Sequence, residues 1–250
     1  MNVDYVFLNS VLTSVLRDTK IGECKVVVKT DGTFVTDYDL IIERRLIAVL
    51  KKLDPKGKVI SEEQHGPSEF YSDQGSIWVL DPIDGTVNIV NASGRYFTCV
   101  AHCVDGHPIF SYIYSHTENK EVFAESKFVI SNLLDSPRAI VFPSLWPTHI
   151  EEQLLKSVSL EFSLIDFNYC GTAHYQELLG GHLDAIFVWG GYPWDHVPHL
   201  HLLKNKGLSI MQLDGAEFKV EINIKPGFVI YQDRVRDKIC SIVSTVKNIL

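Results

Sequence analysis

The sequence predicts a mixed fold, with an N-terminal α+β half around a mostly antiparallel sheet and a C-terminal α/β half. Short β-rich runs between about residues 59 and 127, separated by turn signals such as Asp105-Gly106, indicate the first half. Strands that alternate with helical stretches after Pro137 indicate the second. We expect the halves to span residues 1–132 and 133–250, with no flexible linker between them.

Two amphipathic helices are expected before the first sheet. Apolar residues recur at every fourth position in the first of them, as one buried stripe of a helix would, at Val3, Phe7, Val11 and Val15. The stripe of the second helix consists of Ile42, Leu46, Val49 and Leu53.

The strands of the antiparallel sheet are expected at residues 58–61, 76–80, 96–104, 108–114 and 121–125. In the C-terminal half, strands are expected at 138–142, 162–167, 184–189 and 227–231. The helices between and after them are expected near 148–158, 172–179, 196–206 and 234–249. Thr148 and Glu151 have the spacing of a capping box that opens the first of these helices.

The composition excludes several classes of protein. Apolar residues make up 46% of the 250 residues, as in ordinary globular domains. The net charge is −8, and no block of basic residues is present, so nucleic acid and anionic membranes are not expected as partners. The odd number of cysteines, five, without a C-x-x-C pair predicts reduced thiols in a cytoplasmic protein. We expect no targeting segment and no membrane span.

Two carboxylates stand directly after a hydrophobic strand, in Trp78-Val-Leu-Asp81-Pro-Ile-Asp84-Gly85-Thr86. Proline cannot donate to a strand ladder, so the chain must turn there, and the turn can bring Asp81 and Asp84 together. Two crowded carboxylates repel each other unless a cation joins them. An ordinary surface turn is the alternative, but the apolar approach opposes it, and the spacing does not fit an EF-hand loop.

Further acidic residues follow other predicted elements. Glu62 and Glu63 end the strand before Asp81, and strand alternation would let one of the two face the site. A solvated acidic turn is the alternative. Asp195 follows Trp194 at the start of a helix, where aspartate is also a good N-cap.

Taken together, Ser61-Glu62-Glu63, the D-P-I-D-G-T segment of residues 81–86, Gly171-Thr172-Ala173 and Trp194-Asp195 resemble the inositol monophosphatase family of magnesium-dependent, lithium-sensitive phosphatases. The order and spacing match across roughly residues 25–215. The resemblance implies a layered αβαβα sugar-phosphatase fold, a homodimer, and hydrolysis of a phosphate monoester by a magnesium-activated water.

By position, the resemblance implies two magnesium ions, with a third, looser ion possible near Glu62. The first ion would be held by Glu62, Asp81 and the backbone carbonyl of Ile83, and the second by Asp81, Asp84 and Asp195. Glu62 also counts among the catalytic residues. Ions that share a carboxylate lie about 3.5–4 Å apart, a spacing that can hold both the attacking and the leaving oxygen.

The resemblance further assigns Thr86 as the residue that orients the attacking water and Asp39 as its acidic partner. A structural role is open for Asp39, because Thr36 and Asp39 also have the spacing of a capping box. Gly85 and Thr86 would present backbone N–H groups to the phosphate. Lys29 would lie near that phosphate or be a solvated lysine.

The segment Gly171-Thr172-Ala173, together with Asp195, would line the pocket for the rest of the substrate.

The sequence departs from the family pattern in two segments that concern substrate binding. Val188 stands where many members have an acidic residue that binds substrate hydroxyls, and three histidines occur between His196 and His201. Metal ligation by these histidines competes with ordinary solvated or capping roles.

These departures leave the substrate open. An inositol or sugar phosphate is the first expectation, and the 3′-phosphate of an adenosine bisphosphate is a second one within the same family. A non-catalytic relative that binds a phosphorylated ligand is a third. Retention of every expected metal ligand and of Thr86 argues against this last alternative.

Overall fold

The computed structural model describes residues 3–19, 24–30, 32–64, 74–122, 136–143, 146–223 and 227–250. These residues form seven α-helices, one 3-10 helix and twelve strands in three sheets. The chain divides into two compact units. One consists of Met1–Glu125, Tyr192–His201 and Val220–Asn223, and the other of Ser126–Gly191, Leu202–Lys219 and Ile224–Leu250. The predicted junction at residues 132 and 133 lies outside the described residues.

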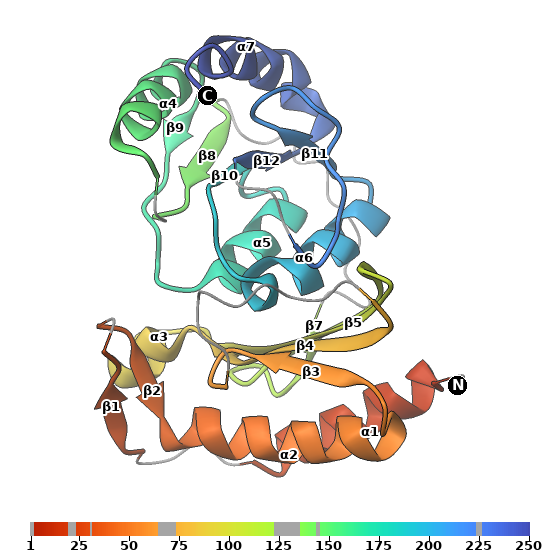
Figure 1. Cartoon of the computed structure of the whole chain (residues 1–250). Coiled ribbons are helices and arrows are strands. Elements are labelled where there is room, and N and C mark those ends of the chain that lie inside the picture. The colour runs from red at the N-terminus through yellow and green to blue at the C-terminus, as the bar shows by residue number, and fades with distance from the viewer. Residues whose placement is uncertain are drawn as a thin grey trace. The chain divides into compact units, whose positions relative to one another are not determined.

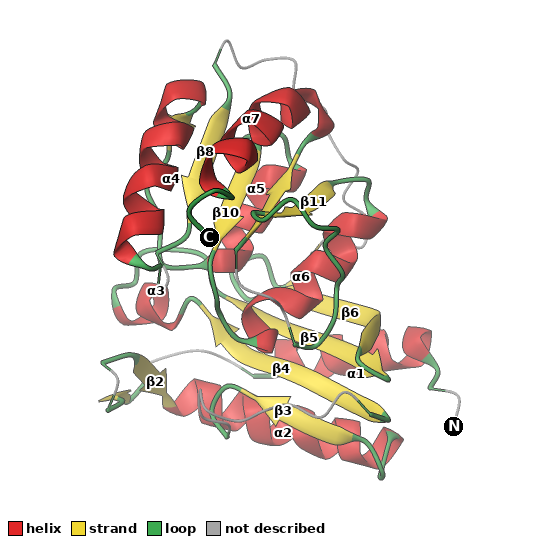
Figure 2. Cartoon of the chain, turned by 45° about the horizontal axis from the view of Figure 1, so that its top comes forward, coloured by secondary structure: helices red, strands yellow, loops and turns green. Residues whose placement is uncertain are grey.

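In the first unit, two long helices, α1 (Tyr5–Arg17) and α2 (Asp37–Leu53), run along one face of a five-stranded sheet (Figure 1; Figure 2). The strands are β3 (Lys58–Ser61), β4 (Ser76–Asp84), β5 (Phe97–Val104), β6 (His107–Ser115) and β7 (Lys120–Val122), in that order. β3 pairs with β4 in parallel, and the other pairs are antiparallel. The predicted, mostly antiparallel sheet is thus confirmed.

The buried residues of α1 differ from those that the sequence predicted for the first helix. In α1 the buried residues are Leu8, Leu12 and Leu16, whereas the predicted Phe7 is 55% exposed. Both sets recur at every fourth residue, so periodicity alone does not choose between them. The leucines contact the core that Trp78 and neighbouring residues of β4 form on this face.

Two short elements close to β4 were not expected. A hairpin of β1 (Val26–Val28) and β2 (Phe34–Thr36) precedes α2 directly. The helix α3 (Thr86–Val90) follows β4 after Gly85. Runs of three to five residues carry too few periods for either pattern to be recognised.

The second unit contains a five-stranded sheet in the order β11-β12-β10-β8-β9. Its strands are β8 (Arg138–Val141), β9 (Ser163–Leu164), β10 (Ala185–Val188), β11 (Ser209–Gln212) and β12 (Phe228–Tyr231). The helices α4 (Thr148–Glu161) and α7 (Arg236–Val246) share one core with it, and α5 (Gly171–Leu179) packs against β10. The 3-10 helix η1 spans Asp233–Val235.

Three predictions for this unit were wrong in detail. The strand expected at residues 162–167 is only the two-residue β9, and β11 was missed. Thr148 does not open a capping box, because it is already the first helical residue and Pro147 occupies the N-cap position without a side-chain hydrogen bond.

Within the described part of the chain, no helix is long and apolar enough to cross a membrane.

Candidate active site

A bulge in β4 places Asp81 and Asp84 on the same face of the sheet. Residues three apart on a regular strand point to opposite faces. Here Asp81 pairs with Cys99 and Asp84 pairs with Phe97, so the pairing register shifts by one residue over Pro82–Ile83. Cys99 and Phe97 are two apart on β5 and share a face, and directly opposed residues do the same. The extra residue of the bulge therefore turns both carboxylates to one side.

That side is the face opposite α1 and α2. Trp78 and Leu80 of β4 contribute to the core under the two helices. Because side chains alternate along a strand, Asp81 points away from that core. Asp81 is nevertheless 2% exposed, and its Oδ1 atom is buried without a hydrogen-bond partner among the described residues.

Asp195 approaches this face from the helix α6 (Pro193–Asn205). Further along α6, Nε2 of His199 lies 3.6 Å from Sγ of Cys99, the residue paired with Asp81. The first turns of α6 therefore cover the side of the sheet to which Asp81 points. Asp195 is the third residue of the helix, and its Oδ2 accepts a 2.9 Å hydrogen bond from the backbone N–H of Tyr192.

The electrostatics show that these carboxylates lie close enough to repel each other. Burial raises the pKa of Asp81 well above its usual range, and the carboxylates of Glu62, Asp84 and Asp195 raise it further. Burial also raises the pKa of Asp195 to about 7. The hydrogen bond from the Tyr192 N–H lowers this pKa, and the nearby carboxylate of Asp84 raises it. A cation on this face would remove both unfavourable effects.

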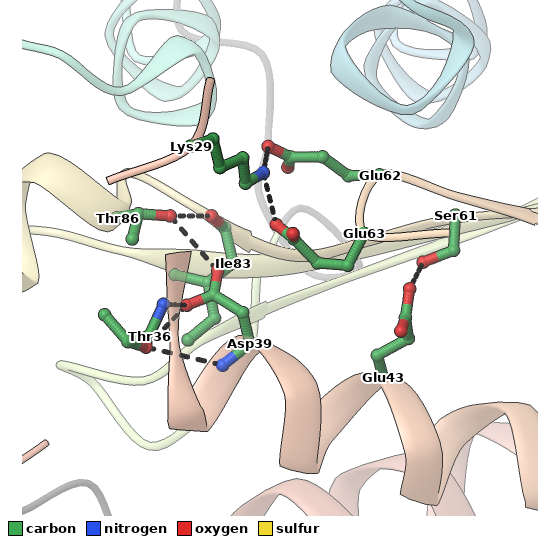
Figure 3. A network of polar contacts seen from close by, with 9 residues as sticks. All are labelled: Lys29, Thr36, Asp39, Glu43, Ser61, Glu62, Glu63, Ile83 and Thr86. Carbon is green, nitrogen blue, oxygen red and sulfur yellow. Dashed lines mark hydrogen bonds and ion pairs between the residues drawn. The ribbon is translucent and has the colours of Figure 1, made fainter. Parts of the chain in front are cut away.

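Glu62 and Glu63 both contact Lys29 (Figure 3). Nζ of Lys29 lies 3.2 Å from Oε1 of Glu62 and 2.7 Å from Oε1 of Glu63. Strand alternation does not apply to the two glutamates, because β3 ends at Ser61 and both lie in a turn. Of the two, Glu62 is the one whose charge raises the pKa of Asp81. Burial raises the pKa of Glu62 to about 8, although Lys29 opposes the shift.

Lys29 is thus not the solvated lysine considered as an alternative. The β1–β2 hairpin holds its backbone, through a 2.7 Å hydrogen bond from the Lys29 N–H to the carbonyl of Thr33. The side chain is 22% exposed. Its positive charge offsets part of the negative charge that the glutamates bring to the site.

Asp39 joins the start of α2 to the start of α3 (Figure 3). Its Oδ2 accepts hydrogen bonds from the backbone N–H and the hydroxyl of Thr36, at 2.8 and 2.5 Å, in a capping box at the start of α2. Its Oδ1 lies 3.2 Å from Oγ1 of Thr86. Asp39 is fully buried, and burial raises its pKa despite these hydrogen bonds. The capping role and the contact with Thr86 therefore coexist.

Thr86 and its neighbours form the turn from β4 into α3. The Thr86 hydroxyl also lies 3.0 Å from the carbonyl oxygen of Ile83, so its single proton can go to that oxygen or to Asp39. Gly85 precedes α3 with φ 95°, in the left-handed region that glycine adopts without strain. The turn thus places the Ile83 carbonyl and the Thr86 hydroxyl next to each other.

Sequence reasoning missed Glu43, which contacts Ser61 at the end of β3, directly before Glu62 and Glu63 (Figure 3). Glu43 is 5% exposed, and its carboxylate accepts a hydrogen bond from the hydroxyl of Ser61. It follows Asp39 by four residues on α2, so the two carboxylates share one helix face. This spacing of four residues on a predicted helix is the sequence feature from which Glu43 could have been predicted.

The segment Gly171-Thr172-Ala173 and Val188 belong to the second unit. The segment forms the first turn of α5, where Thr172 and Ala173 are fully buried and Gly171 is partly exposed. Val188 is the last residue of β10, pairs with Phe228 and is 1% exposed. A glutamate at this position would bury a charge, so the substitution would test stability as well as specificity.

The histidines of α6 are not solvated, contrary to the ordinary alternative. His196 and His199 are 4% and 1% exposed, and Nδ1 of His201 lies 3.0 Å from Oγ of Ser111 on β6. Burial lowers the pKa of His199 to about 3, so its ring is neutral. These rings pack between the helix and the sheet.

The residues present fit magnesium by their chemistry. Carboxylate and carbonyl oxygens are the ligands that magnesium prefers, and the buried, unpartnered Oδ1 of Asp81 lacks the bond that an ion would supply. Among the described residues, no three His, Cys, Asp or Glu side chains are yet arranged to hold an ion. One oxygen of each of two proposed ligands already has a partner, since Oε1 of Glu62 contacts Lys29 and Oδ2 of Asp195 accepts from the Tyr192 N–H.

Comparison with known proteins gives consistent matches. Residues 7–130 match the model of the inositol monophosphatase family. The chain is 22% identical over 209 residues to an inositol monophosphatase of Dictyostelium discoideum, covering 75% of each chain. It resembles the solved structure of an IMPase of Thermotoga maritima, with a TM-score of 0.75, 19% identity and 98% of each chain covered.

A second solved structure is that of an IMPase/NADP phosphatase in complex with Mg²⁺ and phosphate. The TM-score is 0.71 and the identity 18%, over 95% of this chain and 91% of the other. At these identities the structural likeness establishes the fold, and it confirms the predicted layered α/β architecture.

Proposed function

The chain belongs to the inositol monophosphatase family, and we propose that it is a magnesium-dependent phosphatase that hydrolyses a small phosphate monoester of the inositol or sugar phosphate type. The observation that carries the proposal is the bulge of β4. It turns Asp81 and Asp84 to the face on which Asp195 lies, where a buried oxygen of Asp81 has no hydrogen-bond partner among the described residues. Such a concentration of carboxylates is unfavourable without a bound cation.

The proposed ligands are the ones that the sequence resemblance assigns. Glu62, Asp81 and the carbonyl of Ile83 would hold one ion, and Asp81, Asp84 and Asp195 a second. When bound, magnesium would lower the pKa of a water molecule and offset the charge of the phosphate oxygens.

The remaining steps use Asp39 and Thr86. The Asp39 carboxylate holds the Thr86 hydroxyl at 3.2 Å, which orients the lone pairs of Oγ1. A water molecule can donate to those lone pairs and is then aimed at the phosphorus atom. When the water attacks, its proton can pass to Oγ1 while the threonine proton passes to Asp39. The raised pKa of Asp39 favours acceptance of that proton.

The phosphate of the substrate would be held at the start of α3, through Gly85 and Thr86, and Asp195 would contact the rest of the substrate. The sequence resemblance also assigns Gly171-Thr172-Ala173 to substrate binding. Valine at position 188 offers no hydrogen bond to a substrate hydroxyl. We therefore expect inositol 1-phosphate to be a weaker substrate than a phosphate ester with fewer hydroxyl groups.

The test is release of inorganic phosphate from a panel of esters, with magnesium or with excess chelator. The panel contains inositol 1-phosphate, a hexose phosphate, 3′-phosphoadenosine 5′-phosphate and an aryl phosphate. We expect turnover that requires magnesium and is higher on the hexose phosphate or the aryl phosphate than on inositol 1-phosphate. Preference for the adenosine compound would favour a nucleotidase instead. Absence of turnover on every ester would favour a non-catalytic phosphate-binding protein.

Lithium sensitivity belongs to the same proposal. As the resemblance implies, lithium in the second metal site would trap product phosphate there. We expect lithium chloride to inhibit the best substrate reaction at concentrations at which sodium chloride has no effect. Equal responses to the two salts would show that the second site differs from the one proposed here.

Two broader properties complete the proposal. We expect a homodimer in light scattering, and a cytoplasmic location. No disulfide joins the five cysteines, all of which lie among the described residues, as is usual for proteins of a reducing compartment. They are Cys24, Cys99, Cys103, Cys170 and Cys240.

A further inference from the structure

We propose that Thr98 is a positioning residue that fixes the bulge of β4 and thereby the directions of Asp81 and Asp84. The inference rests on the proposed function, since it concerns the same carboxylates. Thr98 belongs to β5 and is fully buried. It is the one residue of β5 between the partners of Asp81 and Asp84, so it faces both Pro82 and Ile83.

The bulge has a backbone group that the sheet does not satisfy. In a β-bulge the extra residue falls out of the regular ladder, and its peptide groups lose their strand partners. The carbonyl oxygen of Pro82 instead accepts a 2.7 Å hydrogen bond from the hydroxyl of Thr98. Proline has no N–H, so this carbonyl is the only backbone hydrogen-bonding group of residue 82. The threonine side chain therefore determines how the bulge is held.

A histidine fixes the direction of that hydroxyl. Nε2 of His116 lies 2.8 Å from Oγ1 of Thr98. The threonine proton is used on Pro82, so Oγ1 can only accept from His116, and Nε2 must carry the ring proton. Burial lowers the pKa of His116 to about 4, which agrees with a neutral ring. The bonds thus run in one direction, from His116 to Thr98 to Pro82.

The imidazole is itself held by aromatic neighbours. The ring of Tyr96 stacks on it at 5.6 Å between centroids and 21° between planes. Tyr114 meets it edge-on at 5.2 Å and 79°. The backbone N–H of His116 also donates to the carbonyl of Tyr96 at 3.2 Å. Because these contacts restrict rotation of the His116 ring, its Nε2–H can hold the Thr98 hydroxyl in one orientation.

The consequence concerns the metal ligands on either side of Pro82. Without the hydroxyl, the buried carbonyl of Pro82 would lose its hydrogen-bond donor. The Pro82–Ile83 peptide plane, which lies between Asp81 and Asp84, could then rotate. Loss of groups that orient metal ligands commonly costs 10–100-fold in metal affinity or activity. We expect an effect of about this size on magnesium affinity.

Two substitutions at one position separate the hydrogen bond from packing. Thr98→Val keeps the shape of the side chain and removes the hydroxyl, while Thr98→Ser keeps the hydroxyl and removes the methyl group. Thr19→Val is the matched control, because Thr19 likewise donates to a carbonyl, of Val15, and accepts from a side-chain N–H, of Arg45, each at 2.8 Å. Among the described residues, no hydrogen bond joins the Thr19 side chain to a proposed metal ligand, since its hydroxyl pairs with Val15 and Arg45.

The measurements are magnesium binding by calorimetry, the magnesium concentration that gives half-maximal phosphate release, and thermal unfolding. We expect Thr98→Val to weaken magnesium binding about 10-fold or more and Thr98→Ser to bind within about 2-fold of the wild type. Thr19→Val should unfold at a lower temperature with unchanged magnesium affinity. Equal magnesium binding by wild type and Thr98→Val, or equal losses in both Thr98 variants, would overturn the proposal.

A second variant covers the case in which Thr98→Val does not fold. His116→Phe keeps an aromatic ring in the stack but removes the donor, and we expect it to weaken magnesium binding several-fold; unchanged binding would overturn the proposal in this case. Failure of the proposed function gives a different result. Wild-type protein would then bind magnesium, and lose affinity in the Thr98→Val variant, without releasing phosphate from any ester.

Discussion

Among single residues, the burial and the surroundings of Asp81 give the main reason to expect a bound cation at the site. One of its oxygens is buried without a hydrogen-bond donor among the described residues, and four other carboxylates raise its pKa. A buried charge is normally paired or bound to a metal. The first two predictions concern residues beside it.

Asp84→Asn should reduce magnesium-dependent phosphate release by about 100-fold or more, because it removes the charge of a ligand of the second metal site. The fold should survive, and the metal-free variant should be at least as stable as the wild type, since one repulsion is relieved. Phosphate release and thermal unfolding in excess chelator check both parts. Full activity of the variant would exclude Asp84 from the metal site.

Thr86→Val should lower kcat by about 100-fold, the lower end of what proton-transfer groups contribute, with little change in KM. The reason is that Oγ1 would no longer relay a proton between water and Asp39. Steady-state kinetics at saturating magnesium measure the two constants. Thr86→Ser retains the hydroxyl and serves as the control, and equal losses in both variants would assign Thr86 a packing role instead.

Single residues also show where sequence reasoning ends. The carboxylates could be found because strand ends and motif spacing are local features. The ion pairs of Lys29 with Glu62 and Glu63 span more than 30 positions and depend on a short hairpin that the sequence pattern did not reveal. The burial of His196 and His199 depends on which face of α6 meets the sheet, and that is a tertiary property.

At the scale of elements, α2 connects the candidate site to the rest of its unit. Its first turn presents Asp39 to Thr86, its second presents Glu43 to Ser61, and its C-cap Asp54 binds the start of β4. The amphipathic stripe of this helix could be predicted from the sequence. The use of its buried acidic residues as anchors could not, because their partners lie on distant strands.

Asp54 provides a prediction for stability against pH. Burial raises its pKa, but hydrogen bonds from Ser76, Trp78 and Gly57 outweigh it, so the pKa in the folded state lies below the usual value of 3.8. A carboxyl with a lowered pKa stabilises the fold above its unfolded pKa, and this contribution is lost as the pH falls through the folded pKa. Asp54→Asn should therefore lose about 1–3 kcal/mol at pH 7, the usual cost of such bonds.

The loss should shrink as the pH falls below about 4, where the wild-type carboxyl takes up its proton. Urea unfolding of both proteins at pH 7, 5 and 3 measures the difference. Phosphate release per folded molecule should remain unchanged, because Asp54 lies at the opposite end of β4 from Asp81. A constant difference at every pH would contradict the assignment of the stabilisation to the ionised carboxyl.

The bulge in β4 is the element that decides the geometry of the site. Pro82 predicted an interruption of the ladder, and the interruption is confirmed, although the strand continues to Asp84. The sequence could not show that the interruption adds one residue and so brings Asp81 and Asp84 to one face. That result depends on the register with β5, which is a long-range pairing.

At the scale of the whole molecule, all the carboxylates proposed as metal ligands belong to one compact unit, although Asp195 is more than a hundred residues away from the others in sequence. The fold class could be predicted because strand and helix patterns are periodic over most of the chain. The division into units could not be predicted in detail, since α6 begins in one unit and ends in the other.

The most direct test of the central claim is calorimetric titration of magnesium into the metal-free protein and into Asp84→Asn, in the presence of inorganic phosphate. If the carboxylates form the proposed site, the wild type binds at least two magnesium ions per chain, whereas the variant loses one binding event. Binding of no magnesium by the wild type, or identical titrations of the two proteins, would contradict the proposed metal site.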